Sequence, residues 1–269
     1  DLVRGDWRRY NKSLNENLIY SSNTTVDIST VNILEKTSHD KSKLIFLSSS
    51  RVYPINDSYA RFKKYLNTGK LSSYDENDNT DGPKTMYGFT KFSSEELIKE
   101  YKYSNNIDYI INRCGLIYGP GQFGKVEQGL VSLWMWKHIN NSKLKFIGHK
   151  GSGKQIRDVL FIEDLCRLIL IQIKEFNNLK NNLFCIGGGK KNIIDLVKLT
   201  EICSKISKKN IIISKVKKTS NYDIPYYVSS IDKINKFSGW KPKKNLIEGL
   251  KELFEWMTKN KKQISRYFQ

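Results

Sequence analysis

The chain has 269 residues, of which 39% are hydrophobic and 12% aromatic, a composition typical of a folded protein and too apolar for a disordered one. No apolar run approaches the roughly 18 residues that a membrane-spanning helix needs, so we expect no membrane partner. The formal net charge of +19 suggests an anionic partner, but the lysines are scattered through every segment, which favours a solvated basic surface and no nucleic-acid site.

Strands and helices alternate along the chain. Helical apolar spacing over residues 24–37 precedes a short β-rich run, 43–50, that ends in small polar residues. Residues 54–84 are rich in Asn, Asp, Ser and Gly, which predicts a long loop with a short helix at 59–66.

The same alternation continues beyond this loop. An amphipathic helix is predicted over 85–104, and a buried strand, closed by Gly and Pro, over 107–121. Further strands are predicted at 143–148 and 181–189, and further helices at 126–139, 161–176, 192–206, 231–239 and 245–260. Buried strands alternating with helices indicate an α/β fold with a parallel sheet covered on both faces. Ligands of such sheets bind at the carboxyl ends of the strands.

The cysteines and histidines predict no metal site. The three histidines lie far apart, with no acidic partner at ligand spacing. Four cysteines show no C-x-x-C spacing, and each has apolar neighbours: Cys114, Cys166, Cys185 and Cys203. We therefore expect four buried, reduced thiols in a cytoplasmic protein.

Tyr87 and Lys91 lie four residues apart on a predicted helix, so their side chains share a face. An ammonium close to a phenol stabilises the phenolate and makes it a usable base. The same spacing recurs at Tyr59 and Lys63, but only Tyr87 opens a helix that lies between a strand ending in serines and a buried strand. Ser49, at that strand end, could hold a substrate oxygen beside the phenol.

The stretch "GHKGSGKQIRD" contains the G-x-x-x-x-G-K frame of an ATP-binding P-loop, from Gly148 to Lys154. Gln155, however, stands where a Ser or Thr hydroxyl must bind Mg²⁺. The residues that follow predict an extended run instead of the helix whose N-terminus should face the phosphates. An ATP site is therefore not expected here.

Four motifs, in order along the chain, resemble the extended short-chain dehydrogenase/reductase family of nucleotide-sugar enzymes. They are "LIFLSSSRVYP", "YGFTK", "RCGLIYGPGQFGKVEQG" and "GSGKQIRDVLFIEDL". The pattern is most similar to the CDP-paratose 2-epimerase group, from about residue 23 onward. The resemblance implies a Rossmann-like parallel sheet, with its N-terminal part missing, and a smaller, helix-rich C-terminal substrate domain. It assigns residues 1–122 and about 159–188 to NAD binding, and 123–158 and 189–269 to the nucleotide sugar.

The resemblance also implies roles for individual residues. The family's catalytic set falls on Ser49, Tyr87 and Lys91, and its cofactor is NAD. The NAD contacts implied are Leu47, Ser48, Tyr87, Lys91, Cys114 and Gly115. The implied substrate contacts are Ser50, Gln128, Phe146, Gln155, Arg157 and Asp223, of which Arg157 would reach the pyrophosphate because guanidinium can bind phosphate oxygens bidentately.

The residues beside Ser49 favour one reaction within the family. Dehydratases of the family carry Asp-Glu there, whereas this chain has Ser50 and Arg51, which disfavours elimination of water. The "GQFGKVEQG" stretch favours 2-epimerisation, by transient oxidation to a ketose and re-reduction. The alternative is a non-catalytic nucleotide-sugar-binding protein on the same fold.

Two departures from the family pattern bear on these expectations. Leu116 stands where many members have Asn. No G-x-x-G-x-x-G turn occurs in the chain, so we expect an N-terminal truncation and weak NAD binding by the isolated chain. A homodimer through the Tyr87 helix is a further expectation from the resemblance.

Overall fold

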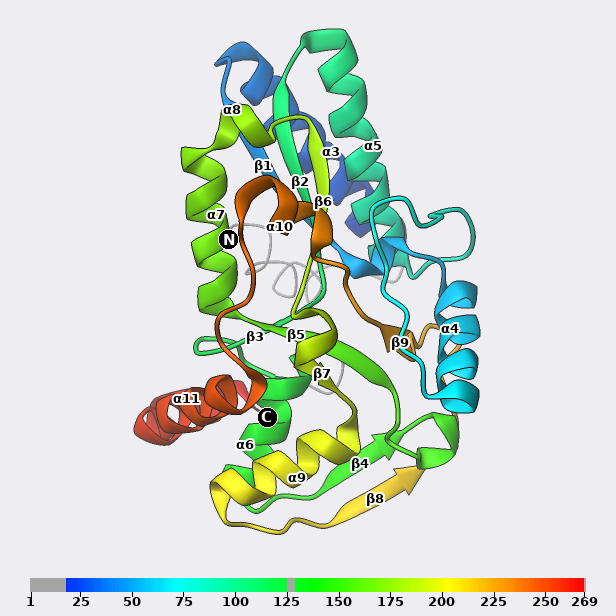
Figure 1. The fold of residues 1–269 in the computed structure, drawn as a ribbon, viewed down its shortest axis with the longest axis vertical. Coiled ribbons are helices and arrows are strands. Elements are labelled where there is room, and N and C mark those ends of the chain that lie inside the picture. Colours follow the sequence, from blue (N-terminus) through cyan, green and yellow to red (C-terminus); the bar gives the residue numbers. More distant parts are fainter. Residues whose placement is uncertain (1–17, 125–128, 269) are drawn as a thin grey trace.

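The computed structural model describes residues 18–124 and 129–268 (Figure 1). At its centre is a parallel sheet with the strand order β1-β2-β6. These strands are β1 (Lys43–Ser49), β2 (Asp108–Cys114) and β6 (Asn182–Ile186). Ser49 pairs with Cys114, which pairs with Ile186, so the three strands end at the same edge. This confirms the α/β fold class and places Leu47, Ser48, Ser49 and Cys114, four of the predicted site residues, at one edge.

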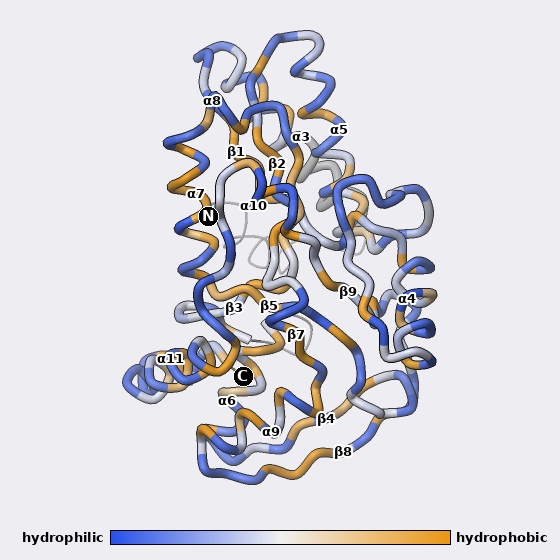
Figure 2. The backbone as a smooth tube through the Cα atoms, viewed as in Figure 1, coloured by the Kyte–Doolittle hydropathy of each residue, from blue (hydrophilic) through white to orange (hydrophobic). Residues whose placement is uncertain are grey.

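Helices cover both faces of this sheet (Figure 1). On one face lie α3 (Leu18–His39) and α5 (Met86–Asn105), packed through Leu34, Ile98 and Ile111. On the other lie α7 (Ile162–Lys174), α8 (Phe176–Leu179) and α10 (Asp232–Ser238), packed around Ile110, Phe184 and Trp240. Figure 2 shows the apolar residues gathered on the strands and alternating with polar ones along α7, as a half-buried helix requires.

A second group of elements forms a separate core. In this group, β5 pairs with three short strands: β3 and β9 run parallel to it, and β7 runs antiparallel. Their bounds are β3 (Leu116–Tyr118), β5 (Ile156–Phe161), β7 (Ile193–Ile194) and β9 (Tyr226–Tyr227). Beside them, β4 (Leu144–Ile147) pairs with β8 (Ile213–Val216). Three helices pack on this layer: α6 (Leu130–Ile139), α9 (Leu196–Ser207) and α11 (Leu246–Lys259). A short helix, α12 (Lys261–Ile264), and a 3-10 turn, Ser265–Tyr267, follow α11.

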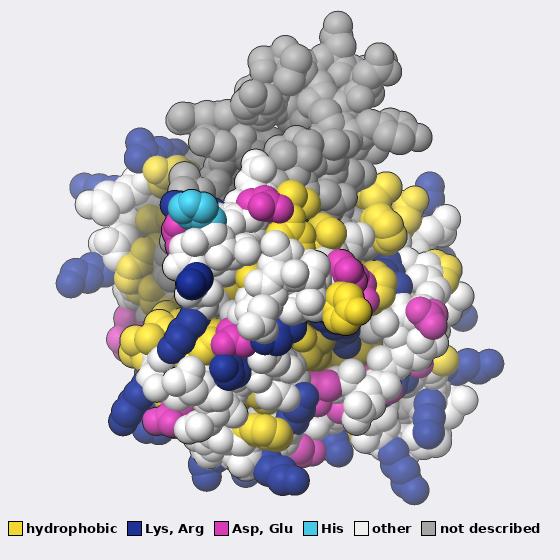
Figure 3. All heavy atoms as spheres, turned by 90° about the horizontal axis from the view of Figure 1, so that it is seen from above, with side chains coloured by type: hydrophobic (Ala, Val, Ile, Leu, Met, Phe, Trp, Pro, Cys, Tyr) yellow, Lys and Arg dark blue, Asp and Glu magenta, His cyan; other side chains and the backbone are white. Residues whose placement is uncertain are grey.

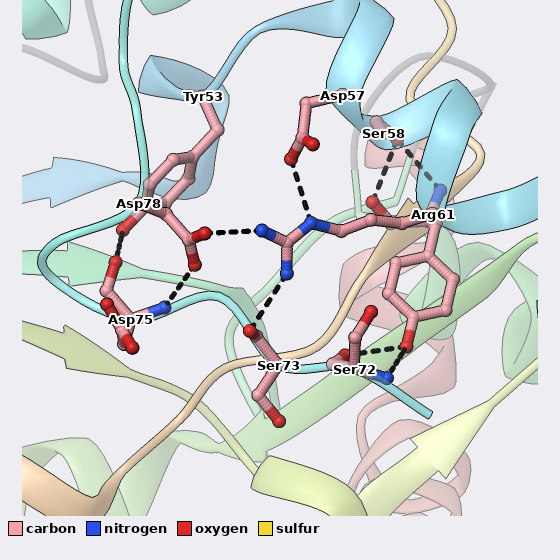
Figure 4. Close-up of polar contacts among 9 residues, drawn as sticks. Tyr53, Asp57, Ser58, Arg61, Ser72, Ser73, Asp75 and Asp78 are labelled. Carbon is pink, nitrogen blue, oxygen red and sulfur yellow. Dashed lines mark hydrogen bonds and ion pairs between the residues drawn. The ribbon is translucent and has the colours of Figure 1, made fainter. Parts of the chain in front are cut away.

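Residues 54–84 are more ordered than their composition predicts. Helix α4 (Ile55–Thr68) exceeds the predicted short helix at both ends. Arg61 on α4 holds the following segment: its Nε donates to Asp57 at 2.8 Å and its guanidinium to the Ser73 carbonyl at 2.9 Å (Figure 4). A further contact joins Arg61 to Asp78, and the Arg61 guanidinium lies 3.9 Å from the Tyr74 ring centroid. These long-range contacts of a single arginine stabilise a segment whose local sequence favours a loop.

The cysteine prediction is wrong at one position. Cys114, Cys185 and Cys203 are buried, whereas Cys166 is exposed. Cys166 lies on the solvent side of α7, where Leu170 is exposed as well, so its apolar neighbours in sequence do not place it in the core. No disulfide is present among the described residues.

The surface agrees with a dispersed positive charge. On the face drawn in Figure 3, Lys and Arg side chains are spread over the outline, with Asp and Glu among them. Within residues 18–124 and 129–268, no helix is both long and apolar enough to span a membrane.

A buried ion pair joins α5 to the sheet. Arg113, on β2, donates to Glu95, on α5, at 2.7 Å, and both side chains are almost completely buried. Ser48, on β1, also donates to Glu95, and Arg113 reaches the Tyr53 hydroxyl at 3.3 Å. The Glu95 carboxylate therefore joins α5 to both β1 and β2 near the carboxyl ends of these strands.

Glu95→Gln is expected to lower the free energy of unfolding by about 3–5 kcal/mol, because it leaves the Arg113 charge buried without its partner. Chemical denaturation measures this change. The matched control is Glu96→Gln on the same helix, whose partner Lys99 is 42% exposed and 2.6 Å away, and which should cost less than about 1 kcal/mol. Equal effects of the two variants would contradict the assigned role of the buried pair.

Candidate active site

Tyr87 and Lys91 are positioned by the first turns of α5. Thr85 caps the helix, since its hydroxyl accepts the Gly88 N–H at 3.0 Å. Gly88 packs directly against the turn that follows β1: a Cβ on Gly88 would lie 2.0 Å from the Arg51 carbonyl oxygen. Only glycine allows this approach. Tyr87, the residue before Gly88, has 52% of its surface exposed.

The Lys91 ammonium lies at the carboxyl end of β1. Its Nζ donates to the Leu47 carbonyl at 3.0 Å and lies 4.7 Å from the Phe46 ring centroid. Ser49, the last residue of β1, is buried, and its hydroxyl accepts the Arg51 N–H at 3.2 Å. The structure thus brings two of the predicted catalytic residues, Ser49 and Lys91, to the same end of β1. Tyr87 lies one helical turn before Lys91.

The ends of β2 and β6 pack tightly on the second core. The Gly115 N–H donates to the Ile186 carbonyl at 2.7 Å. A Cβ on Gly115 would approach both Asp158 and Ser229 to 3.3 Å, and one on Gly187 would lie 2.1 Å from the Ser229 hydroxyl. The predicted NAD contacts Cys114 and Gly115 therefore lie where two layers meet, with Cys114 itself buried.

Asp158 is completely buried at this junction. Its Oδ2 accepts the Gly189 N–H at 2.9 Å. Burial raises the pKa of the Asp158 carboxyl to about 6, and hydrogen bonds from Gly189 and Ser229 only partly oppose that rise.

A cluster of charged side chains lies at the start of β5 and on the loop before β9. His149 Nε2 lies 2.9 Å from Asp223 Oδ2, and an Arg157 guanidinium nitrogen lies 3.8 Å from Asp223 Oδ1. Aromatic rings of α4 pack on His149, with centroid distances of 5.6 Å for Tyr59 and 5.1 Å for Phe62. Two predicted substrate contacts, Arg157 and Asp223, are therefore neighbours.

Arg51, which is absent from the predicted site residues, lies within electrostatic range of this cluster. It lies on a 3-10 turn, Ser50–Val52, between Ser49 and the Tyr87 helix. Burial lowers the pKa of the Arg51 guanidinium, while the nearby Asp223 carboxylate and Tyr87 phenol raise it. The sequence shows an arginine where dehydratases of the family have carboxylates. It does not show that the charge of Asp223 acts on this arginine.

The other predicted substrate contacts are dispersed. Ser50 is half-buried at the start of the 3-10 turn. Gln155 donates from Nε2 to the Ile147 carbonyl at 2.9 Å. Phe146 is packed in the second core, where a Cβ on Gly153 would lie 2.8 Å from its ring. Gln128 lies outside the described residues.

The P-loop-like stretch has the geometry of a turn between two strands. His149–Gly151 forms a single 3-10 turn, Lys154 is exposed, and β5 begins at Ile156. As the sequence predicted, an extended strand follows in place of a helix. The stretch contributes His149 and Arg157 to the charged cluster.

A search against protein-family profiles matches residues 8–187 to the "NAD dependent epimerase/dehydratase family". The chain belongs to this family, and NAD, the cofactor expected from the sequence, is the family's cofactor.

Curated relatives agree with this assignment. A CDP-paratose 2-epimerase of Salmonella typhi is 26% identical over 84% of this chain and 69% of its own length. A putative UDP-glucose 4-epimerase of Methanocaldococcus jannaschii is 30% identical over 91% of this chain and 72% of its own. Against an Escherichia coli dTDP-glucose 4,6-dehydratase, the chain spans only 48% of the relative's length.

Solved structures share the fold. UDP-glucose 4-epimerase of Thermotoga maritima, solved with UDP-glucose, matches with a TM-score of 0.74 and 23% identity. The match covers 90% of this chain and 72% of the Thermotoga maritima chain. UDP-glucuronic acid 4-epimerase of Bacillus cereus, solved with its substrate and NAD, has a TM-score of 0.72 and 23% identity, covering 86% of this chain and 67% of its own.

The residues at the end of β1 suit the nicotinamide half of NAD. Lys91 supplies a cationic donor beside Leu47, whose side chain is 41% exposed at the strand end. Tyr87 presents an accessible phenol on the same helix face. An ammonium and a phenol of this kind can hold ribose hydroxyls beside a reacting sugar.

The Asp158 carboxyl gives a pH-dependent prediction. Its folded pKa of about 6 lies above the model-peptide value of 3.8, so the stabilisation that it provides is complete below pH 4 and is lost as the pH rises through 6. Asp158→Asn can still accept the Gly189 N–H but does not titrate. We expect the unfolding free energy of this variant to gain about 2 kcal/mol relative to the native chain between pH 4 and pH 7, measured by urea denaturation. A constant difference across that range would show that Asp158 titrates normally.

Proposed function

We propose that the protein is an NAD-dependent epimerase of a nucleotide-activated sugar, with Ser49, Tyr87 and Lys91 as its catalytic residues. The observation that carries this proposal is the hydrogen bond from Lys91 Nζ to the Leu47 carbonyl, at 3.0 Å. That bond fixes the ammonium at the end of β1, beside Leu47, which lies two residues before Ser49. Tyr87, one helical turn before Lys91, is 52% exposed.

Each residue has a distinct task in this proposal. Tyr87 takes the proton from the sugar hydroxyl and later returns it, as a general base and then a general acid. Lys91 stabilises the phenolate by its charge. Ser49 holds the sugar oxygen by a hydrogen bond, and its own position is fixed by the Arg51 N–H at 3.2 Å. Bound NAD supplies the reversible oxidation of the sugar carbon.

Epimerisation is favoured over dehydration by the turn beside Ser49. Elimination of water requires an acid and a base at the sugar, and the turn Ser50–Val52 offers Ser50 and Arg51 but no carboxylate. On the helix that carries Tyr87, the buried carboxylate of Glu95 is paired with Arg113, so it cannot serve as a free acid. A ketose formed at this site would therefore be re-reduced.

The substrate that we propose is a CDP-linked sugar, inverted at its second carbon. Support comes from the similarity to the Salmonella typhi CDP-paratose 2-epimerase and from the "GQFGKVEQG" stretch. We further propose that residues 1–122 and 159–188 serve NAD binding, while residues 123–158 and 189–269 hold the nucleotide sugar.

Tyr87→Phe is expected to lower kcat by about 10²–10⁴-fold on a CDP-linked sugar, because it removes the group that moves the hydroxyl proton. The assay follows sugar inversion by NMR, with the protein expressed from its full reading frame and its NAD content measured. Tyr103→Phe is the control: Tyr103 lies on the same helix and is 89% exposed, so its loss should leave kcat unchanged.

Two results would overturn the proposal. Full activity of Tyr87→Phe would exclude the assigned base. Binding of sugar nucleotides without inversion of any CDP- or UDP-linked sugar would favour the alternative, a non-catalytic binding protein on the same fold.

A further inference from the structure

Residues 119–124 follow β3 and include three glycines. Glycine loses more backbone freedom on folding than any other residue, so such a turn keeps one conformation only where other groups hold it. Gln122 supplies two of these contacts: its Nε2 donates to the Ile117 carbonyl at 3.0 Å, and its Oε1 accepts from the Ser132 hydroxyl at 3.0 Å. A Cβ on Gly124 would lie 2.3 Å from a backbone nitrogen of α6, so the turn also packs closely on that helix.

Phe123 adds a contact between this turn and aromatic rings that lie far away in the sequence. Its ring stacks on Tyr267, with centroids 4.5 Å apart and 25° between the ring planes. Phe268 meets the Phe123 ring edge-on, at 5.9 Å and 82°, and Trp256 of α11 lies 6.4 Å away. Aromatic pairs at such separations attract one another beyond the effect of the area that they bury.

The two rings that meet Phe123 most closely are themselves held in place. Phe268 is buried, and it stacks on Trp136 of α6 with centroids 4.5 Å apart and 17° between the planes. The Tyr267 hydroxyl accepts from the Arg266 guanidinium at 2.8 Å, and that guanidinium lies 4.8 Å from the Tyr267 ring centroid. Tyr267 and Phe268 therefore join the turn 119–124 to α6 through side chains that belong to neither.

The stack of Phe123 on Tyr267 lies at the surface. Phe123 is 37% exposed and Tyr267 41% exposed, whereas Phe268 and Trp136 belong to the core that α6, α9 and α11 enclose. Because water covers part of both stacked rings, their contact contributes less to the stability of the fold than a core pair does. Its main effect is local, since it restricts a glycine-rich turn.

We propose that Tyr267 is a positioning residue for the nucleotide sugar: it acts through Phe123, and it keeps the turn 119–124 in the conformation that binds. The inference rests on the proposed function for one point, that the region beginning at Phe123 holds the nucleotide sugar. A turn that is already ordered loses little conformational entropy when the ligand binds. A turn without its aromatic contact must be ordered at that moment, which lowers the affinity.

Calorimetric titration with CDP and with UDP tests this role in the protein expressed from its full reading frame. Tyr267→Ala should weaken the binding of the tighter of the two nucleotides by about three- to tenfold, because the contact that orders the turn is lost. Tyr267→Phe keeps the ring and should bind as the native chain does. Phe123→Leu should weaken binding by a similar factor, and combining it with Tyr267→Ala should cause no further loss, since both act through one contact.

Two controls separate positioning from a general loss of stability. Tyr103→Ala removes the same ring from α5, where Tyr103 is 89% exposed, and should leave the nucleotide affinity unchanged. The proposed NAD contacts lie elsewhere, between Leu47 and Gly115, so Tyr267→Ala should retain the NAD content of the native chain. Thermal unfolding followed by circular dichroism reports the folding of each variant.

Native nucleotide affinity of Tyr267→Ala would overturn the inference. So would equal losses of NAD and nucleotide, or additive losses in the double variant. A native chain that binds neither CDP nor UDP would reject the proposed function together with this inference. Nucleotide binding needs no turnover, so an affinity that depends on the Tyr267 ring in a protein that inverts no sugar would support the role of Tyr267 and reject the proposed function.

Discussion

The ion pair between Glu95 and Arg113 is the contact on which the site geometry depends. It joins α5, which carries Tyr87 and Lys91, to β2, and Ser48 attaches β1 to the same carboxylate. An ion pair removed from water pays a large desolvation penalty and is retained where its geometry is satisfied on every side. Here that geometry sets the height of α5 above the strand ends, and the close approach of Gly88 to Arg51 sets its tilt. The Lys91 ammonium is then held at the end of β1 by its hydrogen bond to the Leu47 carbonyl, and Tyr87 lies one helical turn before it.

The same contacts extend toward the charged cluster. Arg113 reaches the Tyr53 hydroxyl, which donates to the Asp75 carbonyl at 2.7 Å. That segment is held to α4 by Arg61 (Figure 4), and α4 packs its aromatic rings on His149. Contacts of Tyr53, the segment 73–78 and α4 thus link the Glu95–Arg113 pair to the charged cluster around Asp223.

Much of this could be predicted from the sequence, where local patterns suffice. Helical spacing placed Tyr87 and Lys91 on one face, and the β-rich run ending in serines placed Ser49 at a strand end. Contacts between distant segments could not be predicted. From the sequence alone, Glu95 is one more polar residue of an amphipathic helix, because its partner Arg113 lies on a distant strand. Likewise, the residues after α4 that bind Arg61 are separated from it in the sequence by more than ten positions. At the position of Arg51 the sequence showed only that a carboxylate is absent. Asp223 and Arg157, whose charges act on Arg51, lie far away in the sequence.

In the proposed reaction, one sugar carbon is oxidised and re-reduced, and its hydrogen stays in the site between the two steps. Epimerisation in ordinary water of a CDP-linked sugar that carries deuterium on the inverting carbon tests it most directly. If the hydrogen leaves that carbon and returns to it inside the site, mass spectrometry should find the deuterium retained in the inverted product. Loss of the deuterium to solvent would show inversion by proton exchange at carbon and would contradict the account.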